Sequence, residues 1–439
     1  MSQTQLSKNP YKGARDFYPE DKRILRYIFD CWIRVVESYG YEQYDAPLLE
    51  DLAIYTAKSG QEIINEQTYS LVDKAGRKLA IRPEMTPSVT RMVAKKRQEL
   101  IYPLRLYSIP NLWRYERQQK GRFREHWQLN VDLFSDDIES ANFEILEVSD
   151  KIFKSFKASR KMYQFHVNDR SLTDYFLKDY LKLNESQSFR VIKLIDRFHK
   201  LDLDDFINQL DLILSDQQKQ NQTIEKLLEI LNNKNPDKLP KILLNEEIVK
   251  NFIKFFEVLK ANFTNLEFDS TIVRGFDYYT GFVFEVYDTD PENNRSMMGG
   301  GRYDNLLKIF DVPPIPTIGF GLGDATMINF ILSHGLLPNL SVETDLFYVN
   351  LSQTNLFDRT IINYLRDQGI RVYEVQNNQK LAHQIKKALK KHVPFFMAVG
   401  EDEISSRRFK LKNLITSQEL ELSLEGVVET IRQNQASKF

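Results

Sequence analysis

The sequence predicts an α+β protein in which a helical stretch interrupts an antiparallel sheet flanked by helices, and in which a small α/β domain follows. Strand-like alternation marks residues 113–132 and returns in residues 270–287. The residues between them carry an almost unbroken helical pattern. From residue 344 onward, strands and helices alternate, as in a parallel or mixed sheet. We therefore expect four segments, which are residues 1–170, 171–263, 264–336 and 344–439.

Length and composition exclude several classes of protein. At 439 residues the chain is long enough for two or three domains with separate cores. Its 60 Lys and Arg side chains nearly balance 61 Asp and Glu, so any contact with RNA must come from local basic patches. The single cysteine, Cys31, excludes an internal disulfide and a cysteine-rich zinc site. The first residues contain no segment of the signal-peptide type and no later apolar run has the length of a membrane span, so we expect a soluble cytoplasmic protein.

Residues 113–132 predict two strands around a basic loop. On the incoming strand, we expect the side chains at positions 112, 114 and 116 on one face and those at 113 and 115 on the other. On the outgoing strand, polar side chains at 128, 130 and 132 alternate with apolar ones at 129, 131 and 133. The polar face is costly to cover unless a ligand or mutual pairing satisfies it. Arg117, Lys120, Arg122 and Arg124 crowd the loop, which suits phosphate groups; the alternative is a solvated hairpin with surface ion pairs.

This hairpin resembles motif 2 of class II aminoacyl-tRNA synthetases, in the form found in histidyl-tRNA synthetases. The resemblance implies that Arg114 holds the α-phosphate of ATP and that Gln128 and Asp132 bind histidine. Asp132 stands where much of the family has glutamate, and the shorter carboxylate can accept the same hydrogen bonds. The resemblance also implies a class II synthetase catalytic domain around this hairpin.

The N-terminal part is similar to motif 1 of the same enzymes. Apolar side chains recur at helical spacing in residues 21–39, Gly40 follows, and the next strand is broken at Pro47. The resemblance implies that these elements build a homodimer interface. An edge strand with an ordinary proline is the alternative.

Residues 67–92 predict a β-hairpin followed by a helix. Glu84, Met85 and Thr86 lie where the second strand gives way to that helix. In the histidyl family the residues matching Glu84 and Thr86 help bind the substrate histidine. The resemblance implies that Glu84 binds the ammonium group of histidine, and Met85 lies between these two residues. The alternative for Glu84 is a first-turn carboxylate that complements the helix dipole.

The strand-like segment at residues 270–287 contains the peptide RGFDYY. An arginine in so apolar a hairpin needs an anionic partner, which Asp277 would supply in the simplest interpretation. The peptide resembles a signature of histidyl-tRNA synthetases and their relatives. It implies that Arg274 contacts the α-phosphate during adenylation and that Tyr278 and Tyr279 line the imidazole pocket.

Two glycine-rich strands and a helix after them resemble class II motif 3, with one departure. The Glu-Arg pair that precedes the helix in those enzymes is replaced by Ala325 and Thr326, and no arginine occurs between Arg302 and Arg359. The arginine that grips the γ-phosphate is therefore missing. Either another basic residue serves the pyrophosphate end, or ATP use is weakened. We expect Asp324 to cap the helix.

The remaining segments resemble parts that contact tRNA in this family. In histidyl-tRNA synthetases a helical insertion in the place of residues 171–263 closes over the acceptor end of the tRNA, although a passive helical lobe fits the composition nearly as well. The C-terminal α/β domain is similar to the anticodon-binding domain of histidyl, threonyl, prolyl and glycyl synthetases. If the resemblance holds, the basic side chains within residues 386–391 and 407–412 contact RNA. The alternative is that each of these basic runs is only a solvated surface.

From these resemblances the chain is identified as a member of the histidyl-tRNA synthetase family. This implies ligation of L-histidine to tRNA(His) through a histidyl-adenylate, with ATP as substrate and Mg²⁺ bridging its outer phosphates. The expected histidine-binding residues are Glu84, Met85, Thr86, Arg114, Gln128, Asp132, Arg274, Tyr278 and Tyr279. The expected ATP-binding residues are Arg114, Glu116, Arg122 and Arg274, and Arg114 and Arg274 are also the expected catalytic pair.

The alternative function is that of a regulatory relative. The regulatory subunit of ATP phosphoribosyltransferase keeps the synthetase fold and senses histidine without charging tRNA. Ala325 and Thr326 in motif 3 favour this alternative. The C-terminal α/β domain, which that subunit generally lacks, counts against it, as do Arg114 and Arg274.

Overall fold

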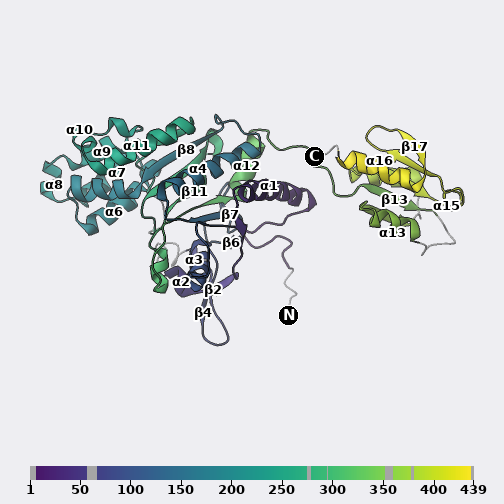
Figure 1. Ribbon diagram of the computed structural model, residues 1–439, viewed down its shortest axis with the longest axis horizontal. Coiled ribbons are helices and arrows are strands. Elements are labelled where there is room, and N and C mark those ends of the chain that lie inside the picture. The colour runs from purple at the N-terminus through teal and green to yellow at the C-terminus, as the bar shows by residue number, and fades with distance from the viewer. Residues whose placement is uncertain are drawn as a thin grey trace. The chain divides into compact units, whose positions relative to one another are not determined.

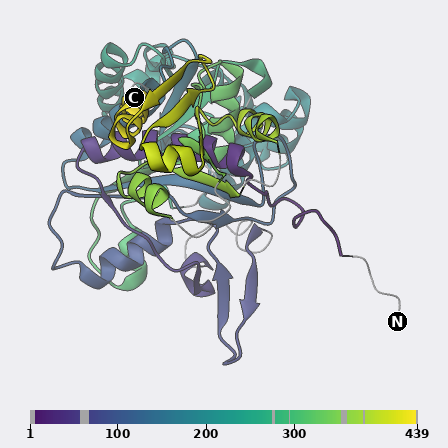
Figure 2. The same cartoon turned by 90° about the vertical axis from the view of Figure 1, so that its right-hand side faces the viewer.

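The computed structural model describes residues 6–56, 67–273, 278–293, 295–351, 359–376 and 380–436. The chain divides into two compact units, residues Met1–Leu337 and Pro338–Phe439. Figures 1 and 2 show it from two directions. Arg274 and Asp277, which the sequence singles out, lie outside the described residues.

A mixed sheet of nine strands forms the centre of the first unit, with the order β1-β5-β7-β12-β11-β10-β8-β9 and with β6 paired to β7. Its strands are β1 (Glu42–Gln43), β5 (Leu104–Ser108), β6 (Asn111–Trp113), β7 (Glu125–Phe134), β8 (Tyr163–Asp169), β9 (Leu266–Phe268), β10 (Phe282–Asp288), β11 (Ser296–Arg302) and β12 (Thr317–Gly323). The neighbours from β5 to β8 are antiparallel, as predicted, whereas the outermost pairs β1–β5 and β8–β9 are parallel.

Three long helices cover one face of this sheet, namely α1 (Pro19–Ser38), α4 (Ile138–Ser155) and α12 (Asp324–Ser333) (Figure 1). Trp32 of α1, Phe153 of α4 and Phe330 of α12 share one apolar core with Val131 of β7. The rings of Phe153 and Phe330 meet edge to face at 5.5 Å between centroids. The alternation read from β7 is therefore confirmed, because its apolar side chains enter this core and its polar ones face the other side.

A small sheet and two helices stand beside the main sheet. The sheet contains β2 (Leu49–Asp51), β4 (Lys78–Ile81) and β3 (Ser70–Val72), and the helices are α2 (Leu52–Thr56) and α3 (Thr86–Lys96). The predicted break at Pro47 is confirmed, because β1 before it and β2 after it belong to different sheets. The β3–β4 hairpin projects from the unit in Figure 2.

The predicted helical insertion is helical throughout its length. Its elements are α5 (Arg170–Tyr175), the π-helix η2 (Phe176–Tyr180), α6 (Glu185–Ile195), η3 (Phe198–Lys200), α7 (Leu203–Asp211), α8 (Asp216–Gln220), α9 (Thr223–Leu231), η4 (Pro236–Lys238), α10 (Lys241–Leu244) and α11 (Glu247–Asn262). Val191, Phe206 and Leu227 belong to a separate apolar core of this lobe. Phe252 and Leu259 of α11 instead pack into the core of the main sheet, which ties the lobe to it.

The second unit has a five-stranded mixed sheet with the order β14-β13-β15-β16-β17. Its elements are β13 (Leu346–Asn350), α13 (Thr360–Asp367), β14 (Val372–Gln376), α14 (Leu381–Lys390), β15 (Phe395–Val399), α15 (Glu401–Ser406), β16 (Phe409–Asn413), β17 (Glu419–Leu422) and α16 (Leu424–Ala436). The predicted strand–helix alternation is confirmed for β13 to β15, which pair in parallel. The antiparallel hairpin of β16 and β17 was not predicted.

Three local predictions were wrong. Of the segment 270–287, only the part from Phe282 onward is a strand among the described residues. The incoming strand of the 113–132 hairpin ends at Trp113, because the Tyr115 N–H donates to the carbonyl of Gln67 and so leaves the ladder with β7. Asp324 is the first residue of α12 and not its cap; Gly323 is the N-cap, and the Asp324 side chain binds other segments.

Candidate active site

The polar side of β7 borders a cleft of about 1080 Å³. The walls come from parts of the chain that are distant in sequence: the loop after β6, the glycines of β11 and β12, the start of α12, and residues 195–200 of the insertion. Arg114, Glu116, Arg122 and Gln128 line it, as the sequence predicted for a ligand site.

Glycines in β12 allow the polar side chains of β7 to lie across the neighbouring strand. A β-carbon on Gly321 would come within 2.4 Å of Nε2 of Gln128. A β-carbon on Gly319 would come within 2.6 Å of the Tyr303 hydroxyl and 2.9 Å of Oδ1 of Asp132. Real β-carbons do not approach other heavy atoms so closely, so the glycines of motif 3 make room for the side chains of motif 2.

Five buried side chains form what we call the acidic cluster: Glu84, Asp132, Tyr44, Tyr278 and Tyr303. Tyr278 donates to Oε2 of Glu84 at 2.9 Å, Tyr44 donates to Oδ2 of Asp132 at 3.3 Å, and Tyr303 donates to Oδ1 of the same carboxylate. The rings of Tyr278 and Tyr303 meet edge to face at 5.7 Å, which joins the two halves of the cluster. The cluster lies behind the wall of the cleft and not on it.

Asp132 is an unusual carboxyl group. It is 3 % exposed, and no basic side chain of the described residues lies within ion-pair distance of it. Its pKa is raised to about 6, chiefly by burial and to a smaller extent by the nearby Glu84 charge, while the hydrogen bonds from the two tyrosine hydroxyls act in the opposite direction. A cationic group that entered the cluster would therefore find an uncompensated carboxylate.

Arginines dominate the opposite end of the site. Nε of Arg114 donates to the carbonyl of Pro83 at 2.8 Å, which fixes this arginine to the residue before Glu84. Arg122 pairs with Glu116, and this pair together with the charges of Arg114 and Arg295 lowers the pKa of Glu116 against the effect of burial. The positive field is also evident at His126, where burial and the nearby arginines lower the pKa to about 3, so His126 is neutral.

The start of α12 is fixed by a buried ion pair with the N-terminal segment. Arg15 donates to Oδ2 of Asp324 at 2.7 Å, and Oδ1 of Asp324 accepts the Trp127 N–H at 3.1 Å. The Arg15 guanidinium also stacks on the ring of Phe123 at 4.3 Å. This contact holds the N-terminal segment, the loop after β6 and motif 3 in one arrangement.

The structure separates the predicted site residues into groups. Arg114, Glu116, Arg122 and Gln128 line the cleft, while Glu84, Asp132 and Tyr278 lie in the acidic cluster. Thr86 is the first residue of α3 and contacts the Tyr278 hydroxyl, and the Tyr279 ring lies tilted against that of Tyr278 with 5.0 Å between the ring centroids. The Met85 side chain is fully buried in a separate apolar core beside the sheet. Arg274 lies outside the described residues.

Three neighbours of these residues were not predicted as site residues: Tyr44, Arg15 and Arg295. Tyr44 and Arg15 reach the site from segments that are 88 and 309 positions away from their partners. Nothing local in the sequence signals such contacts. Tyr303 directly follows the glycine-rich strand that ends at Arg302, and this position was the one signal that the sequence offered for it.

One group of side chains in the described part of the chain has the composition of a metal site: His166, Glu267 and Asp269, whose ligand atoms lie within 4.8 Å of one another. Nζ of Lys234, however, lies 3.0 Å from Oδ2 of Asp269 and 3.4 Å from Oε1 of Glu267. An ammonium group thus already neutralises these carboxylates, so the group does not fit a divalent cation.

The first unit has a mostly antiparallel sheet with an arginine after β6 and glycine-rich strands beside β7, and an α/β unit follows it. This is the architecture of a class II aminoacyl-tRNA synthetase. The model of the family described as histidyl-tRNA synthetase matches residues 13–325, and that of the anticodon binding domain matches residues 355–434. The chain belongs to the histidyl-tRNA synthetase family.

Individual relatives agree with this assignment. The chain is 40 % identical over 436 residues to a protein of Leptospira biflexa named histidine–tRNA ligase, with 99 % of each chain covered. It is 36 % identical over 429 residues to a protein of the same name from Picrophilus torridus, covering 96 % of this chain and 98 % of that one. The crystal structure of histidyl-tRNA synthetase from Nostoc sp. PCC 7120 superposes with a TM-score of 0.78 at 22 % identity, covering 98 % of this chain and all of that one, which confirms the predicted fold class.

Within the described ranges, every helix is too short or too polar to cross a bilayer.

Proposed function

We propose that this chain ligates L-histidine to tRNA(His) and that it first activates the amino acid with ATP as a histidyl-adenylate. The observation that carries the proposal is the combination, in one unit, of the acidic cluster with an arginine-lined cleft. Carboxylates and hydroxyls suit the ammonium and imidazole groups of histidine, and arginines suit a triphosphate. Membership of the histidyl-tRNA synthetase family supports the same reaction.

The acidic cluster and the adjoining cleft wall form the histidine subsite in this proposal. Imidazole has one donor and one acceptor, so it can exchange hydrogen bonds with a carboxylate and with a tyrosine hydroxyl or the Gln128 amide. Glu84 and Asp132 supply the charge that the ammonium group needs, and Thr86 and Tyr279 lie beside Tyr278. A site built from such hydrogen bonds rejects analogues that lack them by roughly 10⁴-fold or more. Met85 supports the subsite from its core.

The arginine end of the cleft is where ATP would bind. In the adenylation step a carboxylate oxygen of histidine attacks the α-phosphorus, the bond to the bridging oxygen breaks, and pyrophosphate leaves with the electron pair. Arg114 and Arg274 hold the α-phosphate and stabilise the negative charge that develops on it, while Glu116 and Arg122 contact the rest of the nucleotide. The chain forms no covalent intermediate, so positioning and fixed charge supply the acceleration.

Mg²⁺ would enter with ATP as part of the substrate complex. Glu116 and Asp324, both on the wall of the cleft, are already paired with arginines. No group of three acidic or histidine side chains lies at this end in the described part of the chain. The phosphates, and not a preformed protein cage, therefore provide most of the ligands.

Three further assignments complete the proposal. The helical insertion, residues 171–263, closes over the acceptor end of tRNA(His), and residues 344–439 bind the anticodon, where Lys386, Lys390 and Lys391 form an exposed basic face. The protein is a cytoplasmic homodimer, with the exposed apolar side chains of Leu48 and Leu49 beside Pro47 at the interface.

Charging of a tRNA(His) transcript with labelled histidine tests this function. We expect the protein to charge this tRNA and to leave other tRNAs uncharged, and we expect Arg114→Ala to lower the rate at least 100-fold. Ala325 and Thr326, in the place of the Glu-Arg pair of motif 3, support the regulatory alternative. A folded protein that binds histidine but charges no tRNA would establish that alternative instead.

A further inference from the structure

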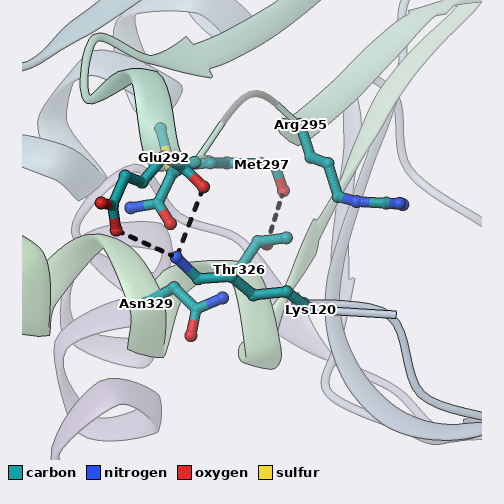
Figure 3. Close-up of a pocket in the computed structure, with 8 residues that line it drawn as sticks. Lys120, Glu292, Arg295, Met297, Thr326 and Asn329 are labelled. Carbon is teal, nitrogen blue, oxygen red and sulfur yellow. Dashed lines mark hydrogen bonds and ion pairs between the residues drawn. The ribbon is translucent and has the colours of Figure 1, made fainter. Parts of the chain in front are cut away.

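A second group of cations lies at the far end of the cleft. Arg295 immediately precedes β11 and borders both the cleft and a smaller adjoining cavity. That cavity is lined by Lys120 and Gly121 of the loop after β6, by Thr326 and Asn329 of α12, and by Glu292, which pairs with Lys120 at 3.8 Å (Figure 3). Arg295 thus borders both the cleft that Arg114 lines and the cavity beside α12, the helix that ends motif 3.

Thr326 is uncharged, so α12 contributes no positive charge to this cavity at position 326. Oγ1 of Thr326 donates within its own turn to the carbonyl of Gly323 at 3.1 Å and reaches the Met297 carbonyl at 3.4 Å. In Figure 3, Thr326 lies across from Arg295, and the loop after β6 passes beneath them. A β-carbon on Gly121 of that loop would be 3.5 Å from Cγ2 of Thr326, so a longer side chain at 326 would meet the loop.

Positive charge is in excess at this end. Arg114, Arg122 and Arg295 all act on the single carboxylate of Glu116. Partial burial and then the charge of Arg122 lower the pKa of Arg295, while Glu116 has the opposite, smaller effect. Among the described residues, Arg295 donates to the neutral amide of Gln119, and no carboxylate lies within 4 Å of it. Like charges held this close are unfavourable until an anion joins them.

We propose that Arg295 holds the β- and γ-phosphates of ATP, and the pyrophosphate that leaves, in place of the arginine that motif 3 lacks. The proposal rests on the proposed adenylation function and assigns one more residue to it. Arg114 lines the same cleft, so a nucleotide with its α-phosphate at Arg114 can direct its outer phosphates toward Arg295. A phosphate oxygen would then replace the Gln119 amide as the acceptor, which exchanges a neutral hydrogen bond for a charge-assisted one.

The test compares how the protein binds ATP, ADP and AMP, each with Mg²⁺, by titration calorimetry. We expect Arg295→Ala to weaken ATP binding by about 10- to 100-fold, the value of one or two charge-assisted hydrogen bonds, and to leave AMP binding within about twofold. Arg295→Lys should recover part of the ATP affinity, since it keeps the charge and loses the fork geometry. The matched control is Arg77→Ala, which removes an exposed arginine paired with Asp73 on the β3–β4 turn.

The outcomes separate this proposal from the function on which it rests. Equal weakening of ATP and AMP, or no effect on either, would overturn the assignment of Arg295 to the outer phosphates. Pyrophosphate exchange with the wild-type protein is measured in parallel. If the wild type shows no exchange, the proposed function fails, whereas the ATP-to-AMP comparison still decides what Arg295 binds.

Discussion

Replacement of Asp132 by asparagine should make the free protein more stable while it destroys the histidine subsite. In the folded chain the Asp132 carboxyl titrates with a pKa of about 6, whereas its ordinary value is 3.8. The folded state therefore keeps a proton that the unfolded state releases. The contribution of Asp132 to the free energy of unfolding is therefore most favourable below pH 3.8, and it is lost as the pH rises through about 6.

The magnitude follows from the separation of the two pKa values. About two pH units, at about 1.4 kcal/mol each, give a cost of about 3 kcal/mol at pH 7.5 and roughly half of that at pH 5. Asparagine carries no charge at either pH, so Asp132→Asn should gain about 3 kcal/mol at pH 7.5 and clearly less at pH 5. Histidine affinity should fall at least tenfold, because a charge-assisted hydrogen bond contributes about 1.5–3 kcal/mol.

Urea unfolding, monitored by tryptophan fluorescence, measures this gain in the free energy of unfolding. All three tryptophans, Trp32, Trp113 and Trp127, belong to the first unit, so the signal reports that unit alone. Asp136→Asn, an exposed aspartate four positions along the chain, is the control and should change neither stability nor binding. A gain that is absent at pH 7.5, or that does not shrink at pH 5, would refute the account of this buried charge.

Three further substitutions test the remaining contacts of the site. Arg15→Met leaves the fully buried Asp324 without its 2.7 Å partner and should destabilise the first unit by about 3–5 kcal/mol in urea unfolding. Glu84→Gln keeps an acceptor for Tyr278 but removes the charge, so the KM for histidine in pyrophosphate exchange should rise about tenfold or more while that for ATP stays within twofold. Gly321→Ala forces Gln128 aside and should weaken histidine binding about tenfold in calorimetry, with little change in the unfolding midpoint.

For each of these three predictions, one result would contradict the reasoning. A loss below 1 kcal/mol for Arg15→Met would mean that Asp324 is satisfied without the arginine. Equal changes in both KM values for Glu84→Gln would mean that this carboxylate does not select histidine. For Gly321→Ala the control is Gly323→Ala, where the nearest atom to the new β-carbon is 3.4 Å away, and the same loss in both variants would argue against a specific effect on Gln128.

Local periodicity was sufficient to predict β7 and the helices beside the site, but not the end of β6 or the start of β10. The alternation along β7 determined which side chains enter the core and which face the opposite side of the sheet, because adjacent side chains on a strand point to opposite faces. Pro47 likewise marked the point where the chain passes from one sheet to another. The roles expected for Arg114 and Asp132 came from resemblance, since the alternation specifies a polar face and not its ligand.

Long-range contacts were beyond the reach of this reasoning. The β16–β17 hairpin has alternating polar and apolar residues, but its strands are short, and the lysines at positions 410 and 412 of β16 indicated a basic face and not a strand. Arg15 reaches Asp324 across 309 positions, and Arg295 faces Gln119 across 176 positions. Only the three-dimensional arrangement brings such residues together, and that is why the sequence revealed the missing arginine of motif 3 without a candidate to replace it.

The adenylation of histidine is most directly tested by ATP–pyrophosphate exchange on the purified protein, with histidine and, separately, with threonine, proline and glycine. We predict that histidine alone supports exchange, because the acidic cluster pairs a charged acceptor with donors that suit imidazole. Absence of exchange from folded protein that still binds histidine would contradict the central claim. It would make this chain a histidine-sensing relative of the synthetases.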